Sequence, residues 1–188
     1  MNRKSVWLNI LTLIVLVAVL TGCSSSFHGG VINPAEPAAD IHMPDQNGND
    51  FQLSAQQGKV VLVFFGFLNC VDECPLTMAH LSQAMKMLGD RAQDVQVVMV
   101  STDPVRDSPQ AMKAYLANFD PTFLGITGTQ DKLKPIWDEY GVVVEDGGET
   151  HSAYTYVIDQ NGDLRLTFDP EMTPDDITAD LETLLAKQ

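Results

Sequence analysis

Two cysteines placed four residues apart are the part of this chain best suited to chemistry. Cys70 and Cys74 stand between a run of apolar residues, 60–65, and Pro75, a residue type that often opens a helix. The first turn of a helix offers unpaired N–H groups and the positive end of the helix dipole, which favour a thiolate over a thiol. Because thiolates attack disulfides and bind metals, the pair predicts either a redox-active dithiol or a soft-metal site.

The spacing also leaves a passive local disulfide open as an interpretation. Such a bridge would close a very small loop and could not hold a whole domain together. A thioredoxin-type oxidoreductase has two residues between its cysteines, whereas three separate Cys70 from Cys74. A peroxidase would carry one dominant cysteine with a threonine ahead of it and an arginine nearby, and neither cysteine has that setting.

Four histidines are available as a third ligand. His28 falls in a polar segment, and His42 opens the first expected strand. His80 lies on the helix expected after the cysteines, where it packs or faces solvent. His151 stands just before an expected strand at 154–158. In thioredoxin-like domains the residue before that strand faces the cysteine loop, so His151 is the candidate ligand.

Two thiolates and one imidazole favour a soft ion of low coordination number. Cu(I) accepts three ligands of this kind, and Cu(II) could use the same three with a weaker fourth. A structural Zn(II) site usually has four protein ligands. The chain offers a fourth only if Asp72 or Asp103 turns toward the sulfurs. The set therefore predicts copper.

The start of the chain predicts export from the cytoplasm. Two basic residues precede an almost unbroken apolar run, 6–20, which is short for a membrane span and typical of a signal peptide. The run ends in Leu-Thr-Gly-Cys, similar to the lipobox of bacterial lipoproteins, in which the cysteine is acylated. We expect residues 1–22 to be a signal peptide and Cys23 to carry a lipid on the extracytoplasmic, for instance periplasmic, face of a bacterial cell envelope. A retained signal anchor is the alternative.

The rest of the chain suits one domain on a tether. Residues 23–40 are rich in Ser, Gly, Pro and Ala, and we expect them to form a flexible tether of about 20–25 Å average reach. Residues 41–188 would form the domain, with no internal repeat. The formal net charge of −14 makes nucleic acids and anionic lipid surfaces poor partners.

The elements that position the cysteines alternate between strands and helices. Continuous apolar runs at 60–65 and 95–100 are typical of central strands buried on both faces. Further strands are expected near 41 and at 51–53, 142–144, 154–158 and 164–168, and helices at 75–88, 108–119, 130–140 and from 173 onward. We predict an α/β domain of the thioredoxin-like class, with a mixed central sheet and helices on both faces.

Four segments carry a family resemblance in the same order along the chain. They are Phe-Phe-Gly-Phe before the Cys-x₃-Cys-Pro sequence, Ser-Thr-Asp-Pro-Val-Arg-Asp at 101–107, Leu-Gly-Ile-Thr-Gly at 124–128, and His-Ser at 151–152. Together they resemble the Sco/SenC family of copper-binding, thioredoxin-like proteins used in assembling cytochrome c oxidase. The resemblance covers roughly residues 41–185.

The resemblance implies a set of roles for this chain. Cys70, Cys74 and His151 would be the copper ligands, and the two cysteines could also form a redox disulfide. Asp72 and Asp103 would lie close to the metal without binding it. The copper-receiving partner would be a protein such as subunit II of cytochrome c oxidase, and a thioredoxin-like reductant could keep the cysteines reduced.

The chain departs from the family pattern at three places. Val71 follows the first cysteine where the family commonly has proline, which predicts a looser cysteine loop. Leu-Asn at 68–69 replaces a common Thr-His pair. Thr150 stands where an acidic residue often precedes the ligand histidine, so one group that could orient the imidazole is missing.

Three functions remain open from the sequence. The first is a membrane-tethered copper metallochaperone, and the second is a thiol–disulfide reductase that keeps the cysteines of the target reduced. The third is an adapter domain with an idle disulfide. His151 separates the first two, because copper binding needs the imidazole and disulfide exchange does not.

Overall fold

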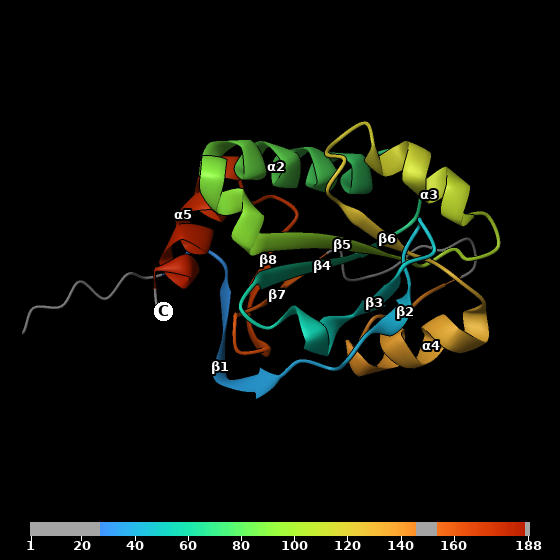
Figure 1. Ribbon diagram of the computed structural model, residues 1–188, viewed down its shortest axis with the longest axis horizontal. Helices are drawn as coiled ribbons and strands as arrows, with labels where there is room; N and C mark the ends of the chain where they lie inside the picture. Colours follow the sequence, from blue (N-terminus) through green and yellow to red (C-terminus); the bar gives the residue numbers. More distant parts are fainter. Residues whose placement is uncertain (1–26, 146–153, 187–188) are drawn as a thin grey trace, which may run out of the picture.

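The computed structural model describes residues 27–145 and 154–186, which form a mixed sheet covered on both faces (Figure 1). The sheet has six strands in the order β1-β8-β7-β4-β5-β6. Its strands are β1 (Gly30–Pro37), β4 (Val60–Gly66), β5 (Val95–Ser101), β6 (Leu124–Ile126), β7 (Thr155–Ile158) and β8 (Asp163–Phe168). β4 pairs in parallel with β5 and antiparallel with β7, so the sheet is mixed as predicted.

Alternation along β4 divides the core into two halves. Val60, Leu62 and Phe64 pack into one cluster, and the intervening residues pack into the other. The first cluster is covered by α2 (Glu73–Leu88), α3 (Pro109–Leu116) and α5 (Pro174–Leu185). The second is covered by α4 (Gln130–Glu139) and by the hairpin of β2 (His42–Pro44) and β3 (Asp50–Gln52). Helices on both faces of the sheet confirm the predicted α/β architecture.

Two short 3₁₀ helices also occur in the described part of the chain. η1 (Leu53–Gln56) leads toward β4, and η2 (Gly89–Asp94) joins α2 to β5. Among the described residues, no helix combines the length and the apolar character that crossing a bilayer requires.

Three element predictions need correction. β6 lies in the segment 124–128, where no strand was expected, and it pairs in parallel with β5. The strand expected at 142–144 does not form. The amide of Val142 donates to the carbonyl oxygen of Trp137 at 2.8 Å, so it closes the end of α4 instead of pairing with a strand. The first long helix begins at Glu73 instead of Pro75, which places Cys74 inside its first turn.

The prediction that residues 23–40 form a flexible tether is wrong for most of the residues of this segment that the structure describes. Residues 30–37 form β1, an edge strand that pairs antiparallel with β8. The low apolar content of this segment was misleading, because an edge strand is held by main-chain hydrogen bonds and most of its side chains are exposed. The folded domain therefore starts at least ten residues earlier than the predicted boundary at 41.

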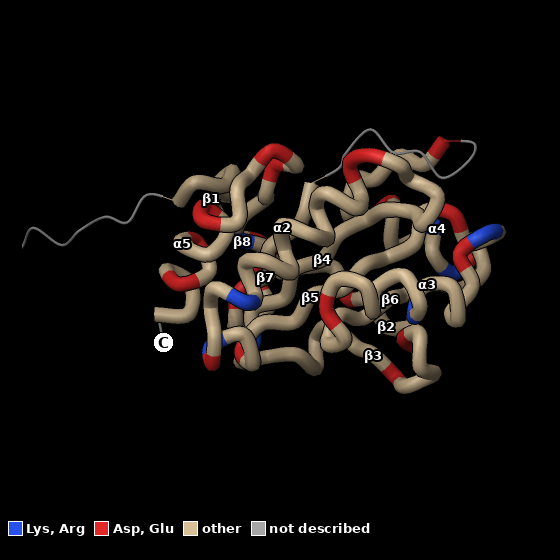
Figure 2. The backbone as a smooth tube through the Cα atoms, turned by 90° about the horizontal axis from the view of Figure 1, so that it is seen from above, with Lys and Arg blue, Asp and Glu red and all other residues tan. Residues whose placement is uncertain are grey.

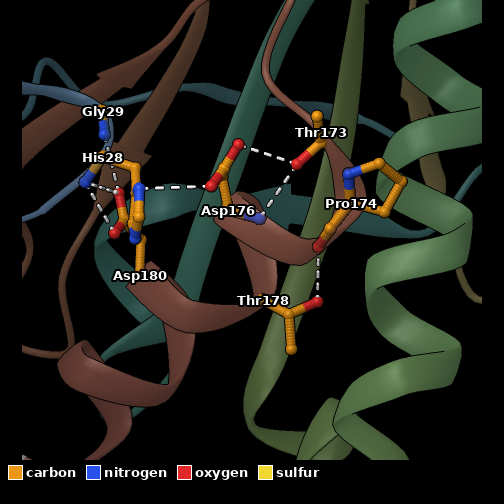
Figure 3. Close-up of polar contacts among 7 residues, drawn as sticks. All are labelled: His28, Gly29, Thr173, Pro174, Asp176, Thr178 and Asp180. Carbon is orange, nitrogen blue, oxygen red and sulfur yellow. Dashed lines mark hydrogen bonds and ion pairs between the residues drawn. The ribbon is translucent and has the colours of Figure 1, made fainter.

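The residues just before β1 are fixed to α5 (Figure 3). The buried carboxylate of Asp180 accepts hydrogen bonds from the amide of His28 at 2.9 and 3.1 Å and from that of Gly29 at 2.8 Å. The imidazole Nδ1 of His28 lies 3.1 Å from a carboxylate oxygen of Asp176. Gly29 is required by close approach, because a Cβ there would lie 2.8 Å from the carbonyl oxygen of Thr167.

Candidate metal centre

The two cysteines lie at the junction between β4 and α2. The residues that connect these elements, 67–72, are called the cysteine loop below. Cys74 is 5% exposed in the first turn of α2, and Cys70 is half-buried in the loop. The amide of Cys74 donates a hydrogen bond to the sulfur of Cys70, with an N···S distance of 3.3 Å. Both cysteines are free thiols, and the amide end of the helix is directed at the more exposed sulfur.

The expected preference for thiolate does not hold at Cys74 in the metal-free protein. Burial raises the pKa of the Cys74 thiol strongly, and its interaction with Cys70 raises that pKa further. A hydrogen bond from the amide of Phe67 acts in the opposite direction but does not compensate. A bound cation would supply the positive charge that a buried thiolate needs, so metal binding and loss of this proton are coupled.

Gly66 makes room for the buried sulfur at the end of β4. A Cβ on this residue would lie 3.0 Å from the sulfur of Cys74 and 2.6 Å from Cε1 of Phe64. Real Cβ atoms essentially never lie as close as 2.6 Å to another atom and rarely as close as 3.0 Å, so only glycine fits without displacing a neighbour. The glycine before the cysteine loop is therefore explained by close packing against Phe64 and Cys74.

The segment after β5 supports the cysteine loop from the side. The amide of Thr102 donates to the carbonyl oxygen of Gly66 at 2.9 Å. The carboxylate of Asp107 accepts the amide of Leu68 at 3.3 Å and the hydroxyl of Ser101 at 2.7 Å. Burial raises the pKa of Asp107, and the hydrogen bonds from Ser101 and Leu68 oppose that shift.

The sequence predicts Asp103 as the aspartate of this segment beside the site, but Asp107 is the carboxylate that contacts the loop. The Asp103 side chain pairs with Arg106, and its amide donates to the hydroxyl of Ser101 at 3.0 Å. Asp72 is exposed, and its carbonyl oxygen accepts the amide of Leu76. No three His, Cys, Asp or Glu side chains converge as a metal site in 27–145 and 154–186, so neither aspartate completes one with the cysteines there.

The candidate histidine and the candidate lipidated cysteine lie outside the described residues. His151 falls in 146–153, and Cys23 falls in 1–26. The chain around His151 is nevertheless bounded by a described strand. In the β4–β7 ladder, Thr155 is paired with Phe64, two residues before Gly66. β7 therefore begins at the edge of the sheet where β4 leads into the cysteine loop.

The other three histidines make contacts away from the cysteines. His28 pairs with Asp176, and His42 Nε2 lies 3.0 Å from a carboxylate oxygen of Asp50. His80 Nδ1 lies 3.0 Å from the carbonyl oxygen of Met172.

Comparison with known proteins places the chain in a family. The SCO1/SenC family model matches residues 33–186. A SCO2-like protein of Rickettsia conorii is 30% identical over 82% of this chain and 87% of its own length. The solution structure of apo Sco1 from Thermus thermophilus superposes with a TM-score of 0.76 at 35% identity, covering 87% of this chain and 100% of that one.

A metal-loaded structure is also similar. Copper-bound ScoI of Bradyrhizobium japonicum superposes with a TM-score of 0.70 at 31% identity, covering 79% of this chain and 99% of that one. The fold, the Cys-x₃-Cys junction and the family match agree over nearly the whole described chain. The protein belongs to the SCO1/SenC family.

Proposed function

We propose that this protein is a lipid-anchored, extracytoplasmic copper chaperone that holds copper through Cys70, Cys74 and His151. It would pass the ion to a copper centre such as that of cytochrome c oxidase. The observation that carries the proposal is the pair of free thiols at the start of α2, linked by the 3.3 Å contact from the Cys74 amide to the Cys70 sulfur. Family membership and the copper-bound relative support the choice of metal.

The two sulfurs have different tasks in this proposal. Cys74 is buried and fixed by the helix, so it is the anchoring ligand. Cys70 is more exposed, so an incoming ligand of an acceptor protein can replace it first. Each thiol that binds copper releases a proton, and the raised pKa of Cys74 makes its affinity for copper more dependent on pH.

The third ligand is supported by the topology at the end of β4. His151 stands four residues before Thr155, whose partner in the ladder is Phe64. A segment that enters β7 must come to the edge of the sheet from which the cysteine loop leaves. An imidazole there would give the trigonal S₂N set that Cu(I) accepts.

A thiol–disulfide reductase is the second candidate, and the unequal exposure of the cysteines favours it. Cys70 accepts a helix amide at its sulfur and is the more accessible thiol, as an attacking thiolate should be. It would attack a target disulfide to form a mixed disulfide. Cys74 would then displace the target thiol, leaving a Cys70–Cys74 disulfide that an external dithiol must reduce.

Copper competition separates the two functions. The soluble domain is titrated with Cu(I) in competition with a chromogenic Cu(I) chelator. In a second assay, the rate at which the reduced protein reduces a small model disulfide is measured. We expect His151→Ala to weaken Cu(I) binding at least tenfold while exchange stays within about twofold. Cys70→Ser and Cys74→Ser should lose both activities. His42→Ala is the matched control, because His42 is exposed on the β2–β3 hairpin.

An unchanged Cu(I) affinity in His151→Ala would exclude the histidine as a ligand. Retention of tight binding in Cys70→Ser would exclude the chaperone proposal itself.

The anchor is tested separately. We expect Cys23→Ser to move the protein from the membrane fraction to the soluble extracytoplasmic fraction and to abolish incorporation of labelled palmitate. Ser25→Ala is the control, and labelled Cys23→Ser protein would contradict the proposal.

A further inference from the structure

Exposed apolar side chains gather around the cysteine loop. Seven large hydrophobic residues of the described chain are exposed. Four of them, Val71, Leu76, Val105 and Tyr154, are called the exposed apolar rim below. Val71 is 94% exposed and Val105 is 88% exposed, so these side chains contribute almost nothing to either core.

Three separate segments bring the rim residues to one end of the sheet. Val71 lies between the two cysteines, and Leu76 lies in the first turns of α2. Val105 lies in the turn between Asp103 and Asp107, which is tied to the cysteine loop through Asp107 and Leu68.

Tyr154 completes the rim from the other side of β4. It immediately precedes Thr155, which pairs with Phe64 near the end of that strand. Backbone pairing and hydrogen bonds therefore place all four residues at the edge where β4 and β5 end. Apolar residues scattered singly are normal on a surface, so a group from three segments around one reactive pair calls for an explanation.

We propose that the exposed apolar rim is the surface on which the copper-accepting protein docks. This inference rests on the proposed function. An acceptor ligand must come within bonding distance of an ion that Cys70 still holds, so the surface around that ligand must cover the surroundings of the cysteine loop. The rim residues are the apolar part of those surroundings, and an acceptor with an apolar surface around its own metal ligands matches them.

Charge defines the periphery of the acceptor. The chain has 25 acidic and 11 basic residues, and acidic positions recur along the backbone in Figure 2. Asp72 and Glu73 are exposed directly beside Val71, while the nearby Arg106 is paired with Asp103. The partner should therefore carry basic residues around its apolar contact, because complementary charges speed association and fix the orientation of docking.

The test compares copper transfer with copper binding. The triple variant Leu76→Gln/Val105→Ser/Tyr154→Ser replaces three rim residues and keeps both cysteines. The matched control is Val31→Ser/Met87→Gln, which removes two exposed apolar side chains on β1 and at the end of α2. Each protein is loaded with Cu(I) and mixed with the purified extracytoplasmic domain of subunit II of the host cytochrome c oxidase, and the rate of transfer is measured.

We expect the rim variant to transfer copper at least tenfold more slowly, with its Cu(I) affinity within about threefold of wild type. The control should transfer within about twofold of wild type. Raising the salt concentration from about 50 to 300 mM should slow transfer by the wild-type protein severalfold, since docking of opposite charges is screened.

Two results would overturn the inference, and they differ from failure of the proposed function. Transfer by the rim variant at the wild-type rate, or an equal loss in the control, would exclude the rim as the docking surface. A wild-type protein that binds Cu(I) but does not transfer it to this acceptor would instead overturn the proposed delivery function. The inference that the rim is a docking surface would then fall as well. A thermal melt of each variant confirms that the folded proteins are compared.

Discussion

The carboxylate of Asp107 holds the cysteine loop by its backbone, accepting the amide of Leu68 at an N···O distance of 3.3 Å. The same carboxylate accepts the hydroxyl of Ser101 at 2.7 Å, so it joins the end of β5 to the loop beside it. A buried hydroxyl and a partly buried amide therefore depend on one side chain. The geometry of the cysteines depends on a residue more than thirty positions away in the sequence.

Asp107→Ala should destabilise the domain by about 2–3 kcal/mol, because a buried hydroxyl and a partly buried amide lose their acceptor. Asp107→Asn keeps an acceptor oxygen and should lose about 1 kcal/mol or less. Urea unfolding of the metal-free proteins measures the free energy of unfolding of both variants. Equal stability of the alanine variant and the wild type would contradict this role.

Replacing Gly66 should disturb the site and the core together. In Gly66→Ala the new methyl group would lie 3.0 Å from the Cys74 sulfur and 2.6 Å from Phe64, so one of them must move. We expect a loss of about 1–3 kcal/mol in stability, as for other overpacked cores, and weaker Cu(I) binding. Chelator competition and urea unfolding are the measurements.

Gly128→Ala is the control for that substitution. A Cβ on Gly128 meets only the flexible end of Met43, at 2.6 Å, and should be tolerated with Cu(I) affinity unchanged. Equal effects of the two substitutions on affinity would mean that Gly66 has no special relation to Cys74.

Removing the Asp180 carboxylate should release the start of the domain. In Asp180→Ala the amides of His28 and Gly29 lose their acceptor, and we expect a loss of about 2–3 kcal/mol. Hydrogen exchange should show lost protection in residues 30–37 with little change in β4. Full protection of β1 in the variant would show that pairing with β8 is sufficient to hold it.

The hydroxyl of Tyr115 should be dispensable for stability. It is buried without a hydrogen-bond partner among the residues that the structure describes. Tyr115→Phe should therefore raise stability by about 0.5–1 kcal/mol. Tyr140→Phe is the comparison, since the Tyr140 hydroxyl donates to the carbonyl oxygen of Ala39 at 2.8 Å, and its loss should lower stability by about 1 kcal/mol. Thermal denaturation of both variants shows whether each substitution raises or lowers the stability relative to the wild type.

Acid should weaken the domain through Asp45 in the β2–β3 turn. Burial acts to raise the pKa of Asp45, but hydrogen bonds from Asn49 and Asn47 outweigh it and the pKa is lowered. A carboxylate with a lowered pKa stabilises the fold above its unfolded value near 3.8, and this contribution disappears as the pH falls through the lowered pKa.

Asp45→Asn should therefore be about 1–2 kcal/mol less stable than wild type at pH 7, and the difference should shrink below about pH 4. Urea unfolding from pH 2 to 7 measures it. A difference in the free energy of unfolding that stays constant over this pH range would exclude ionisation of Asp45 as the cause.

The parts of the fold that the sequence predicts correctly are those with strong local signals. The apolar runs of β4 and β5 and the helix starts near 108 and 173 can each be recognised from a few consecutive residues. The cysteine pair was also found by its spacing and its place before a helix. These features depend on residues that are close together in the sequence, so the sequence of this protein is sufficient to predict them.

The parts that were missed depend on distant partners. β1 looks like a linker because its stability comes from β8 and from the buried carboxylate of Asp180. The role of Asp107 depends on a loop that ends far earlier in the chain, although its spacing from Ser101 in the Ser-x-Asp-Pro-x-x-Asp segment is a usable signal. Burial of Cys74 could not be read from spacing either, and it reverses the expected preference for thiolate.

Fixing His28 and Gly29 to α5 has a consequence for any lipid on Cys23. Only three residues separate that cysteine from Phe27, which already packs on the core. A fully extended chain over this interval spans about 14 Å, so the domain would rest almost directly on the bilayer. The angle at which the domain stands, and not the freedom of a long linker, would then decide which neighbouring membrane proteins can reach Cys70.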